Sequence, residues 1–497
     1  MKKFLGSGLS SVFFILTQSL GYIVTTHLMV HHFSALFASA WFLFMSIGLF
    51  SSVFDFGLSA TLGREIGLSY QRPDQEDLIA RTIYTCISLG TLMAILLLAL
   101  GISLGFLYIH HVFPADYLPI QHAYFYFFLG SFFMFLNSPF LAIHYGFNRV
   151  ASERMLRSLP WILGITALSL CCLVFHSSFE ELGFAWFIQN LISHLFIRIY
   201  TLITFKLSPW RFQICKDRFK AIYRSSPQWS VFTFGGLLVF QSGNFIIAET
   251  LNPTLIAEYV PFMQICSAIL ALGGVVPLIS NPLISRLTAQ GKWEEIRKIF
   301  LWSNQVLLFF VLFLGVYFGY FGREIIQLWL GPNFHYVPFI LLILIISTIL
   351  ETNHFLAVSF AMATGYLNFM TTTVLGGLLT VTLSFLLAKH LGLIGIPLGL
   401  LIGQLSTSNW YAVFITLKRL ALPWPRYLTN LFPLLGYLGV LMASASLLQH
   451  FSLSSVLLLR MIFQGLLLSF AGLLFIGLFS RDKVFNFAHA LSGKPLL

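Results

Sequence analysis

Four polar residues recur at helical spacing within an otherwise apolar stretch of the sequence. Asn190, His194, Arg198 and Thr201 follow one another at spacings of 4, 4 and 3, which places them on one face of an α-helix. A guanidinium group is a strong ligand for phosphate oxygens, which it binds as a fork. A charged side chain within a membrane usually faces water or a partner, so this face is a candidate binding surface.

A second polar face contains the one acidic residue that we expect near the middle of an apolar helix. Ser347, Glu351 and His354 stand at spacings of 4 and 3, and Glu351 is thirteen residues from the predicted outer end at Pro338. A carboxylate at that depth can carry a proton or a cation. We therefore predict that Glu351 and His354 form an ion-coupling site.

Further polar residues belong to other predicted helices. Asn137 and His144 are seven residues apart and share a side, and Gln18 lies on the first helix. We expect Arg198, His194, Asn190, His144, Gln18 and Gln241 to line a central cavity.

Each of these residues also has a simpler interpretation. Arg198 lies eight residues before Lys206, roughly 12 Å inside the membrane boundary, and could extend to the inner headgroups. Glu351 could be protonated and donate a hydrogen bond to another helix, and His144 and His194 could be polar packing residues. Asp55 and Arg64, which close the second helix, could pair with each other.

The composition indicates that these residues belong to helices within a membrane. Of 497 residues, 9% are charged and 58% are hydrophobic, whereas about a quarter of a soluble protein is charged. Apolar runs of roughly 20 residues predict about fourteen transmembrane helices, and the alternating pattern of a β-barrel is absent. The sequence predicts an all-α polytopic membrane protein. The predicted spans are Leu9–Val30, Ala35–Phe54, Thr82–Ile109, Ala123–Phe147, Pro160–Phe175, Gly183–Phe205, Trp229–Thr250, Leu255–Leu283, Ile299–Phe321, Pro338–Met362, Met370–Ala388, Gly392–Leu417, Leu431–Leu448 and Val456–Phe479.

The positive charges orient these helices. If both termini are cytoplasmic, all of the 28 Lys and Arg residues fall in cytoplasmic segments except Arg198, Arg323, Lys389 and Arg460. This agrees with the positive-inside rule. The net charge of +11 is therefore mostly a topology signal, and we expect no nucleic-acid partner.

A weak internal repeat indicates two similar halves. Gln18 and Gln241 open similar strings at an offset of 223, and Phe140 and Phe355 do so at an offset of 215. Arg64 and Arg286 follow the second and eighth predicted helices at an offset of 222. We predict a six-helix lobe over 1–205, a basic linker over 206–228, a second six-helix lobe over 229–417, and two additional helices with a tail over 418–497. Six is even, so the lobes should be related by a pseudo-twofold axis along the membrane normal, as in a transporter.

Other classes of function have less support. The sequence has no GxxxxGK[ST] string, no HExxH string and no nucleophile elbow. Its five cysteines have no metal-binding or disulfide spacing. A membrane glycosyltransferase or polymerase would need carboxylates at the outer face, where Glu180, Glu181 and Asp116 are isolated. We predict no catalytic residues, no metal and no cofactor.

Several strings resemble the polysaccharide transporter branch, the O-antigen flippase type, of the multidrug/oligosaccharidyl-lipid/polysaccharide (MOP) exporter superfamily. They are DFGLSATLGR at 55–64, PLISRL at 282–287, LWLGPNF at 328–334, ATGY at 363–366 and LGLIGIPLG at 391–399. The order of the strings and the fourteen-helix count carry this resemblance, which spans most of the first twelve helices.

The resemblance implies a flippase that moves a polyprenyl-diphosphate-linked oligosaccharide from the inner to the outer leaflet by alternating access. The implied setting is cell-surface polysaccharide biosynthesis in a bacterial inner membrane. The implied partners are the glycan lipid, membrane lipids, H⁺ or Na⁺, and other polysaccharide-assembly proteins. The family's cationic cavity maps onto Arg198, with His144 and His194 as helpers. A multidrug exporter of the same superfamily is the alternative.

Overall fold

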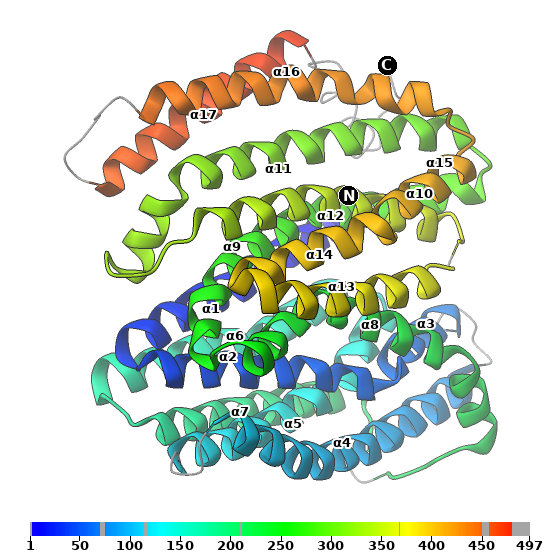
Figure 1. Cartoon of the computed structure of the whole chain (residues 1–497). Helices are drawn as coiled ribbons and strands as arrows, with labels where there is room; N and C mark the ends of the chain where they lie inside the picture. Colours follow the sequence, from blue (N-terminus) through cyan, green and yellow to red (C-terminus); the bar gives the residue numbers. More distant parts are fainter. Residues whose placement is uncertain are drawn as a thin grey trace. The chain divides into compact units, whose positions relative to one another are not determined.

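The computed structural model is helical wherever the chain forms regular structure (Figure 1). It describes residues 2–69, 75–113, 118–208, 211–366, 368–449 and 457–479, and within these ranges it contains no strand. Arg72, Asp116 and the predicted tail after Phe479 lie outside the described residues. The prediction of an all-α fold is confirmed.

The chain divides into two compact units, residues 1–257 and 258–497. The first unit contains α1 (Lys2–His32), α2 (Ala35–Phe50), η1 (Ser51–Asp55), α3 (Leu58–Ser69), α4 (Glu76–Val112), α5 (Leu118–Gly146), α6 (Val150–Leu170), η3 (Cys171–Phe175), α7 (Phe179–Phe205), α8 (Lys216–Thr250) and η4 (Pro253–Leu255). From α9, which begins at the boundary, the elements are α9 (Ile256–Gly273), α10 (Val275–Ala289), α11 (Trp293–Leu330), α12 (Pro338–Ala363), α13 (Met370–Leu391), η5 (Gly392–Ile394), α14 (Gly395–Ser406), α15 (Ser408–Arg419), α16 (Trp424–Gln449) and α17 (Leu457–Phe479).

Thirteen helical segments in the described residues are long and apolar enough to cross a membrane. One of them, Met370–Arg419, is 50 residues long and contains α13 followed by α14 and α15. Since about 20 residues span a bilayer, this segment is long enough for two of the fourteen predicted spans. The chain is a multi-pass membrane protein.

The α13 and α14 helices approach each other through a row of small residues. Gly395, Gly399 and Gly403 recur every four residues, and a Cβ atom on any of them would lie less than 3.0 Å from backbone atoms of α13. At Gly399 the nearest atom would be the backbone nitrogen of Ser384. Small residues allow such close packing in membranes, where apolar burial provides little drive between helices.

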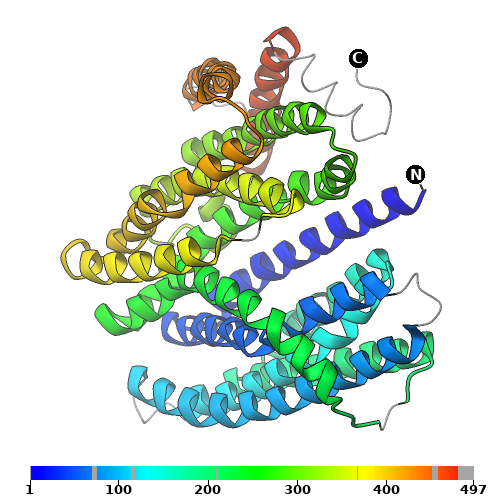
Figure 2. The same cartoon turned by 90° about the vertical axis from the view of Figure 1, so that its right-hand side faces the viewer.

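Several helices begin earlier than their predicted spans, and two of them, α6 and α8, begin ten or more residues earlier. The α6 helix starts at Val150 rather than Pro160, and α8 starts at Lys216 rather than Trp229. The added turns are rich in charge, so the hydropathy of a membrane span does not detect them. Figure 2 shows α8, in green, continuing to the connection with α7.

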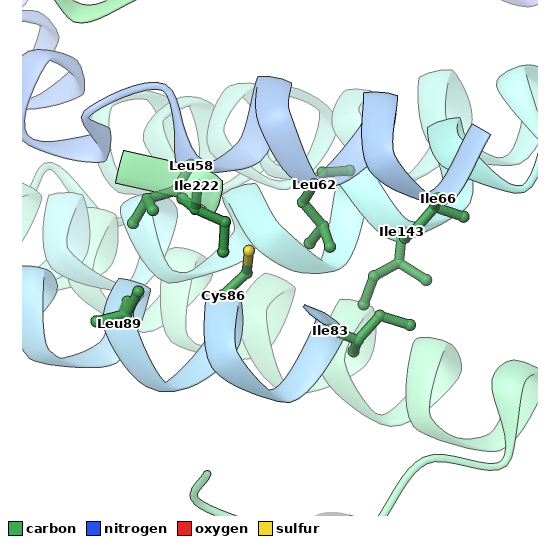
Figure 3. Close-up of a cluster of buried hydrophobic side chains, with 9 residues drawn as sticks. Leu58, Leu62, Ile66, Ile83, Cys86, Leu89, Ile143 and Ile222 are labelled. Atoms are coloured by element: carbon green, nitrogen blue, oxygen red, sulfur yellow. The ribbon is translucent and has the colours of Figure 1, made fainter. Parts of the chain in front are cut away.

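The short α3 helix packs one apolar side onto the first unit. Leu58, Leu62 and Ile66 recur every four residues and point toward Ile83 and Ile143 of α4 and α5 (Figure 3). Arg64, on the opposite side of α3, is exposed. The helix is amphipathic and lies in the sequence between the second and third spans.

The α8 helix contacts α2, α3 and α4 of the first unit. Our predicted lobes place this helix at the start of the second half instead. The boundaries at 205 and 229, and the pseudo-twofold relation between the lobes, stay predictions.

Candidate functional site

The predicted polar faces of α5 and α7 are joined by two pairs of hydrogen-bonded side chains, which we call rungs. His194 Nδ1 lies 2.9 Å from Asn137 Oδ1, and His144 Nε2 lies 3.1 Å from Thr201 Oγ1. Both pairs join residues 57 apart in sequence, so the two helices run in the same direction. All four residues are buried. The rungs join α5 to α7 within the first unit.

The two histidines have further partners. Ser152 Oγ lies 3.1 Å from His144 Nδ1, and the ring of Tyr200 stacks on His144 with centroids 5.6 Å apart. These contacts match the packing interpretation of His144. Any contact of His144 or His194 with a substrate stays a proposal.

Unsatisfied polar atoms lie beside these rungs. Asn190 is fully buried and donates through Nδ2 to the carbonyl oxygen of Trp186 at 2.9 Å. Within the described chain its Oδ1 has no hydrogen-bond partner, and the same is true of Asn137 Nδ2 and of both polar atoms of Gln189. Buried polar groups usually have partners, so this part of α7 can accept a polar ligand or water.

Arg198 lies on the border of the buried face of α7. It is half-buried, one turn beyond the buried His194, and it interacts electrostatically with that histidine. The side chains of its neighbours Leu195 and Ile199 are exposed on the surface of the protein. The guanidinium is therefore placed between the packed interior of the first unit and the surface of α7.

The two glutamines of the predicted repeat have separate partners. Gln18 of α1 is hydrogen-bonded to Tyr22, whose ring centroid lies 4.8 Å from that of Trp161 on α6. Gln241 of α8 accepts a hydrogen bond from Ser46 Oγ of α2 at 3.3 Å, and Asn244 Nδ2 donates to the same Ser46 oxygen at 2.9 Å. These contacts do not join Gln18 to Gln241.

Glu351 and His354 are adjacent on α12, as their spacing predicts. Glu351 Oε1 lies 4.0 Å from His354 Nε2, and the two side chains are 14% and 15% exposed. His354 Nδ1 lies 3.0 Å from the carbonyl oxygen of Ser408 on α15. Glu351 Oε2 is buried and has no hydrogen-bond partner among the described residues. A carboxylate in this setting requires a proton or a cation, because an unpaired buried charge is costly.

A polar network extends from the same helix to α11 and α16. Asn304 Nδ2 donates to Asn353 Oδ1 at 2.6 Å, and Asn353 Nδ2 donates to Tyr427 Oη at 3.1 Å. Gln305 Nε2 donates to the carbonyl oxygen of Asn430 at 2.8 Å. Thus α16, the first of the two additional helices, is joined to α11 and α12.

A charged cluster that was not predicted from the sequence lies at the start of α6. Glu153, whose side chain is 2% exposed, lies 2.6 Å from Arg157 Nε and 3.3 Å from Arg154 Nε. Asp55 also interacts electrostatically with Arg157. The predicted span begins at Pro160, so both arginines fall in a predicted cytoplasmic segment outside it. The i, i+4 spacing of Glu153 and Arg157 was the available signal for a helix.

One suggested ion pair does not form. Arg64 contacts Glu65 Oε1 at 3.2 Å, whereas the carboxylate of Asp55 accepts hydrogen bonds from the backbone N–H and hydroxyl of Ser59. Asp55 therefore caps the first turn of α3. A carboxylate at a helix N-terminus stabilises the helix by accepting hydrogen bonds from its free N–H groups. In the residues that the structure describes, no group of three His, Cys, Asp or Glu side chains could hold a metal ion.

Solved structures with the same fold are membrane transporters. A multidrug resistance MATE family transporter of the MOP superfamily aligns with a TM-score of 0.68 at 12% identity, over 83% of this chain and 98% of its own. The lipid II flippase MurJ aligns with a TM-score of 0.71 at 15% identity, over 95% of this chain and 99% of its own. A MOP superfamily transporter from Pyrococcus furiosus aligns with a TM-score of 0.60 at 13% identity, over 84% of this chain and 96% of its own.

These alignments define the class of protein. The chain has the fold of a polytopic transporter. More particularly, it has the fold shared by the transporters of the MOP superfamily. No protein-family model and no curated protein matches the sequence, so at these identities the likeness concerns the fold.

Proposed function

We propose that this protein is a flippase that moves a polyprenyl-diphosphate-linked oligosaccharide from the inner to the outer leaflet by alternating access. In this proposal it acts in a bacterial inner membrane during cell-surface polysaccharide biosynthesis, with both termini in the cytoplasm. Its partners are the glycan lipid, the surrounding lipids and other polysaccharide-assembly proteins. It is a transporter rather than an enzyme.

The main support for this proposal is the share of the chain that each structural neighbour covers. The lipid II flippase accounts for 95% of the chain, whereas the MATE transporter accounts for 83% although nearly all of its own length is aligned. The difference is on the scale of the two additional helices, α16 and α17. The lipid-flippase neighbour therefore matches the architecture of this chain more completely than the drug-transporter neighbour.

Arg198 is the proposed contact for the diphosphate. Its position at the border of α7 lets the guanidinium reach an anionic group while His194, Asn190 and His144 support the helix behind it. Arg154 and Arg157 on α6 are additional cations at the cytoplasmic end, although Glu153 neutralises one of their two charges. Gln18 and Gln241 supply amide groups on α1 and α8 for the sugar hydroxyls.

Membrane potential and an ion gradient can both drive export. With the inside negative, moving one negative charge outward releases about 2.3 kcal/mol per 100 mV. Glu351 and His354 are the proposed site for a counter-transported H⁺ or Na⁺, because the unpartnered Oε2 can take up either cation.

The alternative is a multidrug exporter. Both hypotheses can be compared in proteoliposomes that contain the purified full-length chain. A flippase exposes an added fluorescent polyprenyl-diphosphate oligosaccharide to an external quencher and does not transport a cationic dye. Dye transport without movement of the glycan lipid would overturn the flippase proposal in favour of the drug exporter.

A further inference from the structure

The connection between α7 and α8 is held firmly against α4. The backbone N–H groups of Ser208, Gln213 and Cys215 donate to the hydroxyls of Tyr84, Ser88 and Thr85 at 2.7, 3.0 and 3.1 Å. The guanidinium of Arg211 also lies over the ring of Tyr84, 4.8 Å from its centroid. These contacts bring the connection and the start of α8 to a defined place beside α4 within the first unit.

The first two turns of α8 have one buried side. Ile222 is 2% exposed and lies in the apolar cluster with Leu58 and Cys86, as Figure 3 shows. Because this residue is fixed, the orientation of the α8 start is fixed as well.

The exposed side of these turns contains basic and aromatic residues. Lys216, Phe219, Lys220 and Tyr223 follow one another at spacings of 3, 1 and 3 and share one helix face. All four are exposed, and the rings of Phe219 and Tyr223 stack with centroids 6.1 Å apart. Phe212, in the preceding connection, is 63% exposed. We call Arg211, Phe212, Lys216, Phe219, Lys220 and Tyr223 the linker surface.

The linker surface lies at headgroup depth if the predicted orientation holds. The α4 helix has 37 residues, about 55 Å at 1.5 Å per residue, whereas a hydrocarbon core of about 30 Å needs about 20 residues. If the core ends near Ile109 on the outer side, as the predicted span does, it ends near Leu89 on the inner side. Tyr84 and Ser88, which hold the connection, then lie up to about 8 Å beyond the core.

The charge of this segment fits one kind of partner. Between positions 206 and 220 the sequence has five basic residues and a single acidic residue, Asp217. The basic residues are Lys206, Arg211, Lys216, Arg218 and Lys220. Basic clusters next to a cytoplasmic membrane face attract anionic lipids, and aromatic rings settle at the boundary between headgroups and acyl chains. An acidic protein would not require several exposed aromatic rings at this depth.

We propose that the linker surface binds the anionic phospholipid headgroups of the inner leaflet and thereby anchors the cytoplasmic end of α8. The proposal uses the predicted orientation of the chain and does not depend on the proposed transport activity. Arg211, Lys216 and Lys220 supply the charge, and Phe212, Phe219 and Tyr223 supply the interfacial contact.

The test measures how anionic lipid changes the thermal stability of the purified full-length protein in detergent. Phosphatidylglycerol should raise the unfolding temperature of the wild type more than phosphatidylcholine does, since a ligand that binds the folded state stabilises it. The triple variant Arg211→Gln, Lys216→Gln and Lys220→Gln should lose at least about half of this difference. The lysine-to-arginine variants Lys216→Arg and Lys220→Arg should retain it.

A second triple variant controls for net charge. Arg64, Arg81 and Lys292 belong to other predicted cytoplasmic segments, and each contacts a carboxylate, at 3.2, 2.6 and 3.2 Å. Changing these three to Gln should leave the response to phosphatidylglycerol intact. The proposal fails if both triple variants lose the response equally. It also fails if the linker variant keeps the full response. In that case an acidic protein would be the better candidate for the partner of this surface.

Discussion

Glu351 Oε1 lies 4.0 Å from His354 Nε2, while the other oxygen of the same carboxylate is buried and has no hydrogen-bond partner within the described chain. His354 is held on its far side by the carbonyl oxygen of Ser408, 3.0 Å from Nδ1. The pair thus connects α12 to the start of α15. An ion that binds Glu351 would change the charge at this connection.

Glu351→Gln should therefore uncouple transport from the ion gradient. Glutamine keeps the shape of the side chain but cannot release a proton. We expect gradient-driven movement of the glycan lipid to fall about 5- to 150-fold, because coupling free energies are of the order of 1–3 kcal/mol. The measurement is transport in proteoliposomes with and without an imposed pH or Na⁺ gradient.

Glu258→Gln is the matched control for this change. Glu258 is partly exposed and contacts His335 at 2.9 Å, away from α15. This variant should keep the gradient dependence. An unchanged gradient dependence in Glu351→Gln would exclude Glu351 as the coupling residue.

Arg198→Gln should abolish transport and leave the amount of protein in the membrane unchanged. Loss of a charge-assisted hydrogen bond costs about 1.5–3 kcal/mol, which corresponds to roughly a ten- to hundredfold loss of substrate affinity. Arg323→Gln, which removes the cation that lies over the ring of Tyr336, should have little effect. Full activity of Arg198→Gln would instead favour the interpretation in which Arg198 extends to lipid headgroups.

The rung between Asn137 and His194 should stabilise the packing of α5 on α7. A double-mutant cycle with Asn137→Ala and His194→Ala should give a coupling energy of about 0.6 kcal/mol, and no more than about 2 kcal/mol, as for other hydrogen bonds between membrane helices. The measurement is the free energy of unfolding in detergent micelles. Strict additivity of the two substitutions would show that the 2.9 Å contact contributes nothing to stability.

Gly399→Leu should destabilise the second unit. Its new Cβ would lie 2.3 Å from the backbone nitrogen of Ser384, so α13 and α14 would have to separate. We expect a loss of about 1–3 kcal/mol or more, the usual cost of overpacking. Gly439→Leu on α16 has no atom within 4 Å of its Cβ position and serves as the control. Equal unfolding temperatures for the two variants would contradict the close approach of α13 and α14.

Hydropathy was sufficient to predict the helices because each span must satisfy its own backbone within the membrane. The predicted span Pro338–Met362 and the helix Pro338–Ala363 differ by one residue. The predicted start at Pro160 was wrong by ten residues because Glu153, Arg154 and Arg157 lower the hydropathy of a segment that is nevertheless helical. Charge marks the end of the apolar run, and the helix can continue past it.

The polar faces were predictable from spacing, but their partners were not. Asn137 and His194 each belong to a face that the sequence reveals, yet nothing in the sequence states that the two faces meet. The partners of Asn353, which are Asn304 and Tyr427, lie 49 and 74 residues away and depend on how three helices pack. Such contacts follow from tertiary packing and have no local signature.

The most direct test of the proposed function is the location of the lipid-linked glycan in cells depleted of this protein. The leaflet can be assigned with a membrane-impermeant enzyme or lectin that modifies glycan on the outer leaflet alone. We predict that the glycan lipid accumulates on the inner leaflet on depletion and that wild-type protein, but not Arg198→Gln, restores its outer exposure. Undiminished exposure of the glycan lipid on the outer leaflet after depletion would contradict the flippase account.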